Sequence, residues 1–403
     1  MFWVCVVEVV VVFFSVAAVM FLSFLGDLVS RRVLLPNVIL LIVVGIVCGP
    51  ILGLFDRAAL VGVVPFLAPL TIAFIGFDAG LGMDVYEVLA QSRRAIVLSV
   101  LGFMLSTCTV GVFLHFAFNL RWAYAFLLAS AWGGVNTATV NAVCKHLKIG
   151  GKSFTTLTMS SLIDDIVVLV CALTLLNYIT LGGMGFQEVS LELIRNLCVS
   201  IFVGVVVGIA WLNVLYIARR TEYVYTFVLA AVLGVYSGTE MLGGTGGIAI
   251  FIFGLILGNC KTLAKSLKLK VDSERLFELR GFIKKFHSEL TFMIATFFFV
   301  FIGLIYVWTG WFELLLGLVV GLLLHATRLV AVRVGTWKSE LAGDFPAIGL
   351  IVGKGAAAAA MSTLPLAYSL PNTEMFTSIA LNVILLTNIF SIVLPILVVR
   401  ISK

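Results

Sequence analysis

Two adjacent carboxylates, Asp164 and Asp165, lie in the middle of an apolar run from about Leu157 to Ile179. A run of that length is typical of a transmembrane helix. An ionised carboxylate at the depth of the bilayer costs at least ~2.5–3.5 kcal/mol on insertion scales, and a second one beside it adds repulsion. Such a pair is expected only where it lines a wet cavity, binds a cation, holds protons or faces a buried base. Each of these arrangements is typical of transport.

A second polar cluster lies in the run 132–141, where two glycines precede Asn136, Thr137 and two further polar residues. Polar and small residues can simply hold helices together in a membrane. Beside a Gly–Gly pair they favour an unwound segment whose carbonyl and side-chain oxygens coordinate a cation. We therefore expect Asn136 and Thr137 to be ligands, together with Ser161, which lies one turn before Asp165.

Two basic residues, Lys354 and Arg328, remain inside predicted spans. Lys354 stands between Gly353 and Gly355, about ten residues into an apolar run, and cannot easily reach either surface. A broken helix would offset its charge, because half-helix ends carry partial charges; the alternative is a re-entrant loop that reaches water. Arg328 stays charged at any accessible pH, and Asp164 is its expected counter-ion.

Asp78 is a further acidic residue, about a turn and a half from the inner end of the third predicted span. It would line an intracellular funnel if it takes part in transport. A structural role is the alternative.

The composition requires a membrane protein. The chain is 62% hydrophobic and only 11% charged, with a mean hydropathy of +1.19, whereas soluble domains carry about 25% charged residues. We predict a single all-α transmembrane domain over residues 1–403, with one sizeable polar stretch, the basic and amphipathic linker Lys261–Lys285. The predicted spans cover about 2–24, 34–55, 60–80, 95–118, 121–144, 157–180, 195–217, 223–241, 246–260, 286–308, 312–333, 344–369 and 376–399.

The basic residues predict the orientation of these thirteen spans. Of the 26 Lys and Arg residues, 21 fall in connections after odd-numbered spans and 3 after even-numbered spans. The positive-inside rule then places the N-terminus outside and the C-terminus in the cytoplasm, in a multi-pass protein of the plasma membrane. The N-terminal run has no basic segment before it, so it is read as the first span and not as a cleaved signal. The seven cysteines and four histidines show no metal or disulfide spacing, and no cofactor is expected.

The two interrupted spans are the fifth and the twelfth. Their separation by seven fits an inverted repeat in which spans 2–6 and 9–13 are the two units. Broken helices at corresponding places in two halves point to a binding site near the middle of the membrane.

These residues resemble the cation/proton antiporter superfamily over essentially the whole chain. Asp164–Asp165 looks like its Asp–Asp motif on the sixth of thirteen spans, and Phe77–Asp84 looks like the Phe-Glu-x-Gly-Leu-x-x-Asp signature of the NhaP-type branch. Ser288–Phe292 with Phe297–Gly303, Arg328, and Lys354–Gly355 are similar to further segments of that branch. The resemblance implies an NhaA/NhaP-like fold with two broken crossing helices, and a homodimer.

Two departures from the family pattern stand out. The fifth-span break of the family usually reads Thr-Asp-Pro, and here Asn136–Thr137 stands near that place. The NhaP-type sixth span usually carries Glu-Ser and then Asn-Asp, and here Ser160–Ser161 precedes Asp164–Asp165. Asp–Asp members are typically electrogenic, so the resemblance implies electrogenic exchange.

The resulting hypothesis is exchange of Na⁺ or Li⁺ for H⁺, in which cation and proton compete at Asp165 with Asp164 beside it. A core bundle, about 95–180 and 312–400, would move against scaffold and dimerisation helices, about 1–80 and 195–308. A K⁺/H⁺ exchanger would use the same residues. A Na⁺-coupled organic-anion carrier would need a larger cavity, and a channel would need symmetric acidic rings. No enzyme motif and no nucleic-acid role are indicated.

Overall fold

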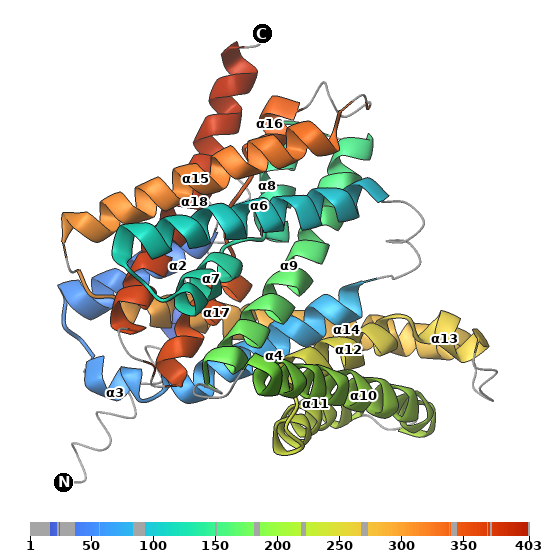
Figure 1. The fold of residues 1–403 in the computed structure, drawn as a ribbon. Helices are drawn as coiled ribbons and strands as arrows, with labels where there is room; N and C mark the ends of the chain where they lie inside the picture. The colour runs from blue at the N-terminus through green and yellow to red at the C-terminus, as the bar shows by residue number, and fades with distance from the viewer. Residues whose placement is uncertain are drawn as a thin grey trace.

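The computed structural model describes residues 17–21, 24, 37–55, 57–83, 93–149, 151–180, 186–218, 223–266, 273–308, 310–337, 339, 345–368, 370 and 373–401. Throughout these ranges the regular structure is helical (Figure 1). This follows from the solvent, because a chain in lipid must satisfy its backbone N–H and C=O groups internally, and a helix does so within one segment.

The helices follow one another with short connections. They are α2 Asn37–Ile46, the π-helical turn η1 Val47–Ile51, α3 Arg57–Val61, α4 Val64–Gly82, α6 Arg93–Phe118, α7 Trp122–Ala131, α8 Thr137–His146, α9 Gly151–Thr180, α10 Phe186–Ala218, α11 Val224–Met241, α12 Gly246–Gly258, α13 Cys260–Ser266, α14 Ser273–Leu304, α15 Trp311–Gly335, α16 Phe345–Gly349, α17 Ala356–Ala367 and α18 Thr373–Ile401.

The predicted polytopic all-helical fold is confirmed. Eight of these helices are long and apolar enough to cross a membrane, and four shorter apolar segments accompany them. Each predicted span from the second to the thirteenth overlaps at least one of the helices. The first predicted span, 2–24, lies almost wholly outside the described ranges, so the count of thirteen stays a prediction.

Both predicted helix breaks are present. The fifth span consists of α7 and α8, separated by residues 132–136, and the twelfth consists of α16 and α17, separated by residues 350–355. The Gly-rich composition of both segments explains the breaks, because glycine is poor in helices and tolerates close backbone contact.

The polar linker differs from its predicted form. Residues 261–285 do not form one separate surface segment, because α13 takes up its beginning and α14 starts at Ser273, well before the predicted start at 286. Residues 267–272 lie outside the described ranges.

The helices form two groups, and α9 extends from the first towards the second (Figure 1). One group, here called the site bundle, consists of α6–α9 and α15–α18, in which α6 packs against α7, α9 and α15. The other, the flanking bundle, consists of α2, α4 and α10–α14, in which α4 packs against α12 and α14. The groups touch where α17 packs against α4, and where the Asn177 side chain of α9 donates to Thr245 Oγ1, just before α12, at 2.7 Å.

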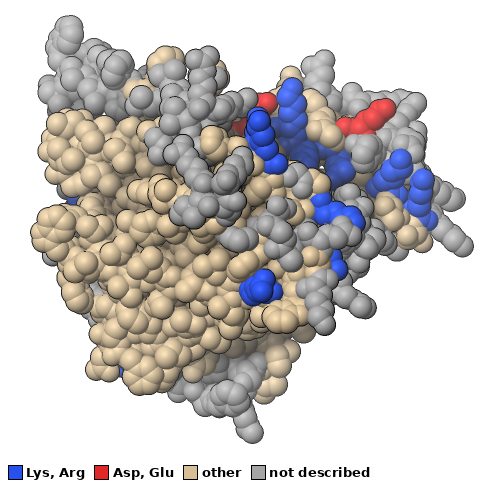
Figure 2. Space-filling model, turned by 90° about the horizontal axis from the view of Figure 1, so that it is seen from above, with Lys and Arg blue, Asp and Glu red and all other residues tan. Residues whose placement is uncertain are grey.

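The surface fits a membrane protein. Figure 2 shows a face on which Lys and Arg gather towards one edge, while most of the remaining described surface is uncharged. Several basic side chains in connections after odd-numbered spans are exposed, namely Arg94, Lys145, Lys148, Lys152, Lys284 and Lys285. Large apolar side chains such as Phe66, Phe116 and Phe202 are also exposed, as expected for a surface in contact with lipid.

Close packing of α4 against α12 depends on two glycines. A Cβ atom on Gly80 would overlap the carbonyl oxygen of Phe251, and one on Gly254 would lie 2.6 Å from the carbonyl oxygen of Phe77. Small residues that let backbones approach in this way are a common means of helix association in lipid.

We therefore predict that Gly254→Ala destabilises the fold by about 1–3 kcal/mol, because the added methyl group must push the two backbones apart. The measurement is the thermal unfolding midpoint of the purified protein in detergent. Gly234→Ala on α11 is the matched control, since no atom lies within 4 Å of its added Cβ. Equal midpoints for the two variants would contradict the packing argument.

Candidate functional site

The two aspartates use different faces of α9. Residues three and four apart share a helix face, so Ser160 lies with Asp164 and Ser161 lies with Asp165. Asp164 is 1% exposed, whereas Asp165 is only partly buried. Neighbouring carboxylates therefore meet different surroundings.

Asp164 is held by groups from three elements. Ser99 of α6 donates to its Oδ1 at 2.5 Å. The backbone N–H of Val135, in the first break, donates to its Oδ2 at 3.2 Å. The Nη1 atom of Arg328, on α15, lies 3.6 Å from the same Oδ2. Both carboxylate oxygens thus have partners inside the site bundle.

Arg328 is buried with its counter-ion. Its side chain is 3% exposed, and its Nη2 donates to Ser160 Oγ at 3.4 Å. The structure therefore places the guanidinium beside Asp164, the partner expected from the sequence. A charge at this depth is tolerated only when it is paired in this way.

Asp165 lies among hydroxyl groups. Thr137, the first residue of α8, donates to its Oδ2 at 3.5 Å, a long distance for an O–H···O bond. Ser161 Oγ lies 3.0 Å from Thr137 Oγ1 and is fully buried. Three of the predicted ligands, Asp165, Thr137 and Ser161, are therefore together at the N-terminal end of α8.

The two breaks cross each other. The backbone N–H of Asn136 donates to the carbonyl oxygen of Gly353 at 2.9 Å. The Asn136 side chain donates to Thr139 Oγ1 at 3.4 Å and packs against Gly355. Asn136 thus has structural partners in the crossing, and its role as a cation ligand stays a prediction.

Lys354 lies at the centre of this crossing and is 1% exposed. Its ammonium donates to the carbonyl oxygen of Gly134 at 2.5 Å. Gly134 belongs to the first break and lies outside the regular helices. Asp164, which attracts the ammonium, and Arg328, which repels it, are among the charged groups near it. The Lys354 carbonyl accepts from Asn388 of α18 at 2.8 Å. The broken-helix environment that the sequence predicted is therefore present, with a carbonyl as the direct partner.

Two glycines allow the breaks to approach their neighbours. A Cβ atom on Gly134 would lie 2.7 Å from Val168 Cγ2 and 3.1 Å from Asp164 Cβ on α9. A Cβ atom on Gly353 would lie 2.5 Å from Thr139 Cγ2. A larger residue at Gly134 would push the first break away from α9, and one at Gly353 would push the second break away from Thr139 of α8 and Asn388 of α18.

Asp78 has a partner in the flanking bundle. Its Oδ1 accepts from Ser288 Oγ of α14 at 2.7 Å. The neighbouring His287 is fully buried, with its Nε2 3.0 Å from the carbonyl oxygen of Phe74 and its Nδ1 3.0 Å from the hydroxyl of Tyr225. Asp78 therefore has a hydrogen-bond partner in the flanking bundle, and both a structural role and a part in an intracellular funnel stay predictions.

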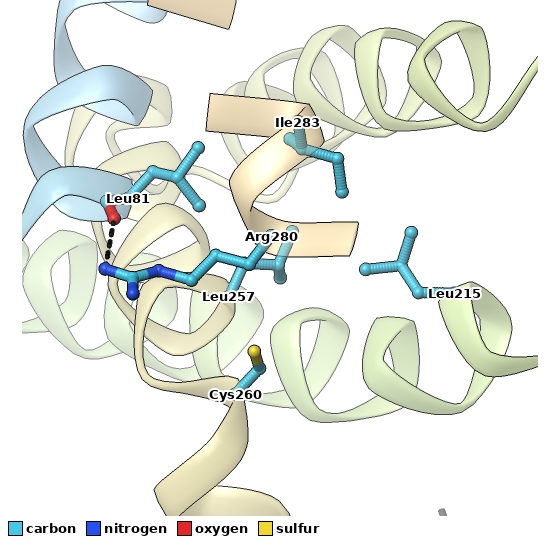
Figure 3. A pocket seen from close by; sticks show the side chains of 6 residues that line it. All are labelled: Leu81, Leu215, Leu257, Cys260, Arg280 and Ile283. Carbon is cyan, nitrogen blue, oxygen red and sulfur yellow. Dashed lines mark hydrogen bonds between the residues drawn. The ribbon is translucent and has the colours of Figure 1, made fainter. Parts of the chain in front are cut away.

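A small pocket in the flanking bundle does not provide a second site (Figure 3). It is lined by Leu81, Leu215, Leu257, Cys260, Arg280 and Ile283, and its water-accessible volume is about 10 Å³. That volume holds about one water molecule. Arg280 points towards the end of α4 and donates to the carbonyl oxygen of Leu81 at 3.4 Å, as basic residues do at helix C-termini.

Several residues of the site were not predicted from the sequence. Ser99 gave no signal, because a single serine in an apolar helix usually bonds to its own helix. Asn388 and Ser391 of α18 support the second break, since Val352 N–H donates to Ser391 Oγ at 2.8 Å. A mid-span asparagine such as Asn388 is a signal that sequence reasoning could have used.

We predict that Arg328→Met costs about 3–5 kcal/mol, because it leaves the buried Asp164 without its guanidinium. Adding Asp164→Asn in the same chain should recover part of that loss, since both members of the pair are then uncharged. Unfolding of the single and double variants in detergent measures the coupling. Purely additive losses would show that the pair does not interact.

Comparison with known proteins gives consistent results. A family model described as "Sodium/hydrogen exchanger, transmembrane" matches residues 16–400. The chain is 25% identical over 388 residues to a K(+)/H(+) antiporter NhaP2 of Shewanella sp. (strain ANA-3), which covers 93% of this chain and 64% of that protein. It is 22% identical over 291 residues to Na(+)/H(+) antiporter 1 of Methanocaldococcus jannaschii, covering 69% and 65%. The chain therefore spans just under two thirds of the length of these relatives.

The fold is also similar to a solved structure. The sodium proton antiporter MjNhaP1 from Methanocaldococcus jannaschii at pH 8 superposes with a TM-score of 0.75 at 19% sequence identity, over 96% of this chain and 98% of that chain. This likeness concerns the fold. Because the family model covers nearly the whole chain, this protein is an integral, multi-pass membrane protein of the sodium/hydrogen exchanger family.

Proposed function

We propose that the chain exchanges Na⁺ or Li⁺ for H⁺, with Asp165 as the site that both occupy in turn. The contrast between the aspartates carries the proposal. Asp164 accepts a 2.5 Å hydrogen bond and faces a guanidinium, whereas the hydrogen-bond donor to Asp165 is a hydroxyl at 3.5 Å. A carboxylate held this loosely remains free to bind a substrate.

The ligand chemistry suits a small alkali cation. The Asp165 carboxylate and the Thr137 and Ser161 hydroxyls offer hard oxygen atoms on one side of α9. A proton and a cation cannot both occupy the same carboxylate oxygens, so they compete. Cation and proton then cross the membrane on the same group in opposite directions, which is transport and not enzyme chemistry.

Alternating access would use the two helix groups. In this proposal the site bundle is the moving core, and the flanking bundle is the scaffold, which corresponds to the predicted division of the chain. We place the protein in the plasma membrane, with its N-terminus outside and its C-terminus in the cytoplasm. This orientation puts the connections that carry most of the basic residues on the cytoplasmic side. A homodimer stays a prediction, since the exposed apolar face of α10 suits either lipid or a second copy.

K⁺/H⁺ exchange at the same residues is the second candidate. It is favoured by the similarity to the NhaP2 proteins, which are named K(+)/H(+) antiporters. Na⁺/H⁺ exchange is favoured by the similarity to proteins named Na(+)/H(+) antiporter 1 and sodium proton antiporter MjNhaP1. Competition between Rb⁺ and Na⁺ in the same vesicles separates the two, because Rb⁺ substitutes for K⁺ by size.

We predict that Asp165→Asn abolishes cation-driven proton movement, because an amide neither takes up the transported proton nor offers a charged ligand. The measurement uses the full chain in liposomes with a pH-sensitive dye inside, and compares Na⁺, Li⁺ and K⁺.

Glu240→Gln is the matched control for this change. Its Oε1 accepts from Gly246 N–H at 2.8 Å, and glutamine keeps that acceptor. The control should retain exchange. Native rates in Asp165→Asn would rule out the proposed site.

The pH dependence follows from competition. Falling pH protonates Asp165 and evicts the cation, so the half-saturating Na⁺ concentration should rise about tenfold for each pH unit in the acidic range when one proton competes. It should rise about a hundredfold when two compete, as in electrogenic exchange. Exchange rates measured against Na⁺ concentration at several pH values test this. A half-saturating concentration that does not change with pH would contradict competition.

A further inference from the structure

Ser99 lies outside both breaks and outside α9, yet it contacts the site. It is fully buried on α6, and its hydroxyl donates to Asp164 Oδ1 at 2.5 Å. Gly102, one turn later, lies under the partner of Asp164, because a Cβ atom there would be 2.9 Å from Arg328 Nη1. One face of α6 therefore supports both members of the Asp164–Arg328 pair.

The pair in turn holds the first break. Val135 N–H donates to Asp164 Oδ2 at 3.2 Å, and Thr137 follows two residues later with its hydroxyl 3.5 Å from Asp165. Gly134, the residue before Val135, has no space for a side chain, because a Cβ atom there would lie 2.7 Å from Val168 Cγ2 and 3.1 Å from Asp164 Cβ. The segment therefore has little room to move towards α9. Asp164 is therefore one of the groups that position the segment leading to Thr137.

We propose that Ser99 is a positioning residue that acts through Asp164 to fix the spacing of Thr137 and Asp165, and so determines how strictly the site selects cations by size. The inference rests on the proposed exchange at Asp165. A site whose oxygens are held at fixed distances discriminates between ions of different radius, and a looser site adapts to both. Groups that orient ligands from behind commonly change metal affinity by about 10–100-fold when they are removed.

The test is Ser99→Ala in the full chain, reconstituted in liposomes. Half-saturating concentrations of Li⁺, Na⁺, K⁺ and Rb⁺ are measured together with the maximal exchange rate. We expect the half-saturating concentration of the preferred cation to rise about tenfold, the maximal rate to change less, and the ratio between Na⁺ and K⁺ to move towards one. Ser99→Thr keeps the hydroxyl and should restore the preference.

Ser106→Ala is the matched control. Ser106 is also a buried serine of α6, and its Oγ lies 3.0 Å from Thr327 Oγ1 of α15. Its loss removes a buried hydroxyl from the same helix, α6, without touching Asp164. The control should keep the cation preference of the unmodified protein, even if its unfolding midpoint falls as much as that of Ser99→Ala.

The outcomes separate two failures. If the unmodified protein shows no exchange, or Asp165→Asn keeps it, the proposed function fails. If exchange depends on Asp165 but Ser99→Ala keeps the ratio between Na⁺ and K⁺, or Ser106→Ala alters it equally, only the role of Ser99 is overturned. Should Ser99→Ala not fold, Ser99→Cys and Gly102→Ala apply the same test, the second by displacing the Arg328 guanidinium.

Discussion

Two stretches of chain without regular helix lie inside a bundle of apolar helices, and their backbone groups must find partners there. An unpaired group in such surroundings costs several kcal/mol. The breaks meet this demand partly through each other, by the bond from Asn136 N–H to the Gly353 carbonyl. They also use side chains, since Asp164 accepts from Val135 N–H and Lys354 donates to the Gly134 carbonyl.

This requirement explains why the buried charges and the breaks occur together. Burying Lys354 and Asp164 in a continuous apolar helix would cost free energy, because neither charge would have a partner. The breaks would also cost free energy without polar side chains that bond to their backbone N–H and C=O groups. Arg328 completes the arrangement by pairing with Asp164. The charged residues of this region therefore have a structural function that is distinct from the role proposed for Asp165. Adjacent residues of identical type can divide such tasks because they lie on different faces of one helix.

The sequence predicted those parts of the site in which charged, polar or glycine residues interrupt an apolar helix. A Gly–Gly pair with polar neighbours predicted the first break, and a lysine between glycines predicted the second. The need to compensate a permanent charge predicted that Arg328 would meet Asp164, and the two lie 3.6 Å apart. Helix boundaries were less predictable, because a helix can continue through polar residues beyond the end of the apolar run that predicted it. The early start of α14 at Ser273 is the clearest example.

Other parts of the site were outside the reach of sequence reasoning. Ser99 contacts Asp164 across 65 positions of chain, and a serine in an apolar helix carries no sign of such a partner. Whether Lys354 would face a carboxylate or a carbonyl depended on how the two breaks cross, which is a property of the packed fold. The roles assigned to Asp165, Thr137 and Ser161 stay predictions, although the structure brings the three together.

The hydrogen bond between Asn177 of α9 and Thr245 beside α12 joins the two helix groups. A net contribution of about 0.5–1.5 kcal/mol is typical of such a bond, which corresponds to roughly a two- to tenfold bias in an equilibrium. Any rearrangement that separates α9 from α12 at this point must break this hydrogen bond and lose its contribution to the free energy. In the proposed exchange cycle, a single amide and hydroxyl would thus bias the equilibrium between conformers without fixing one of them.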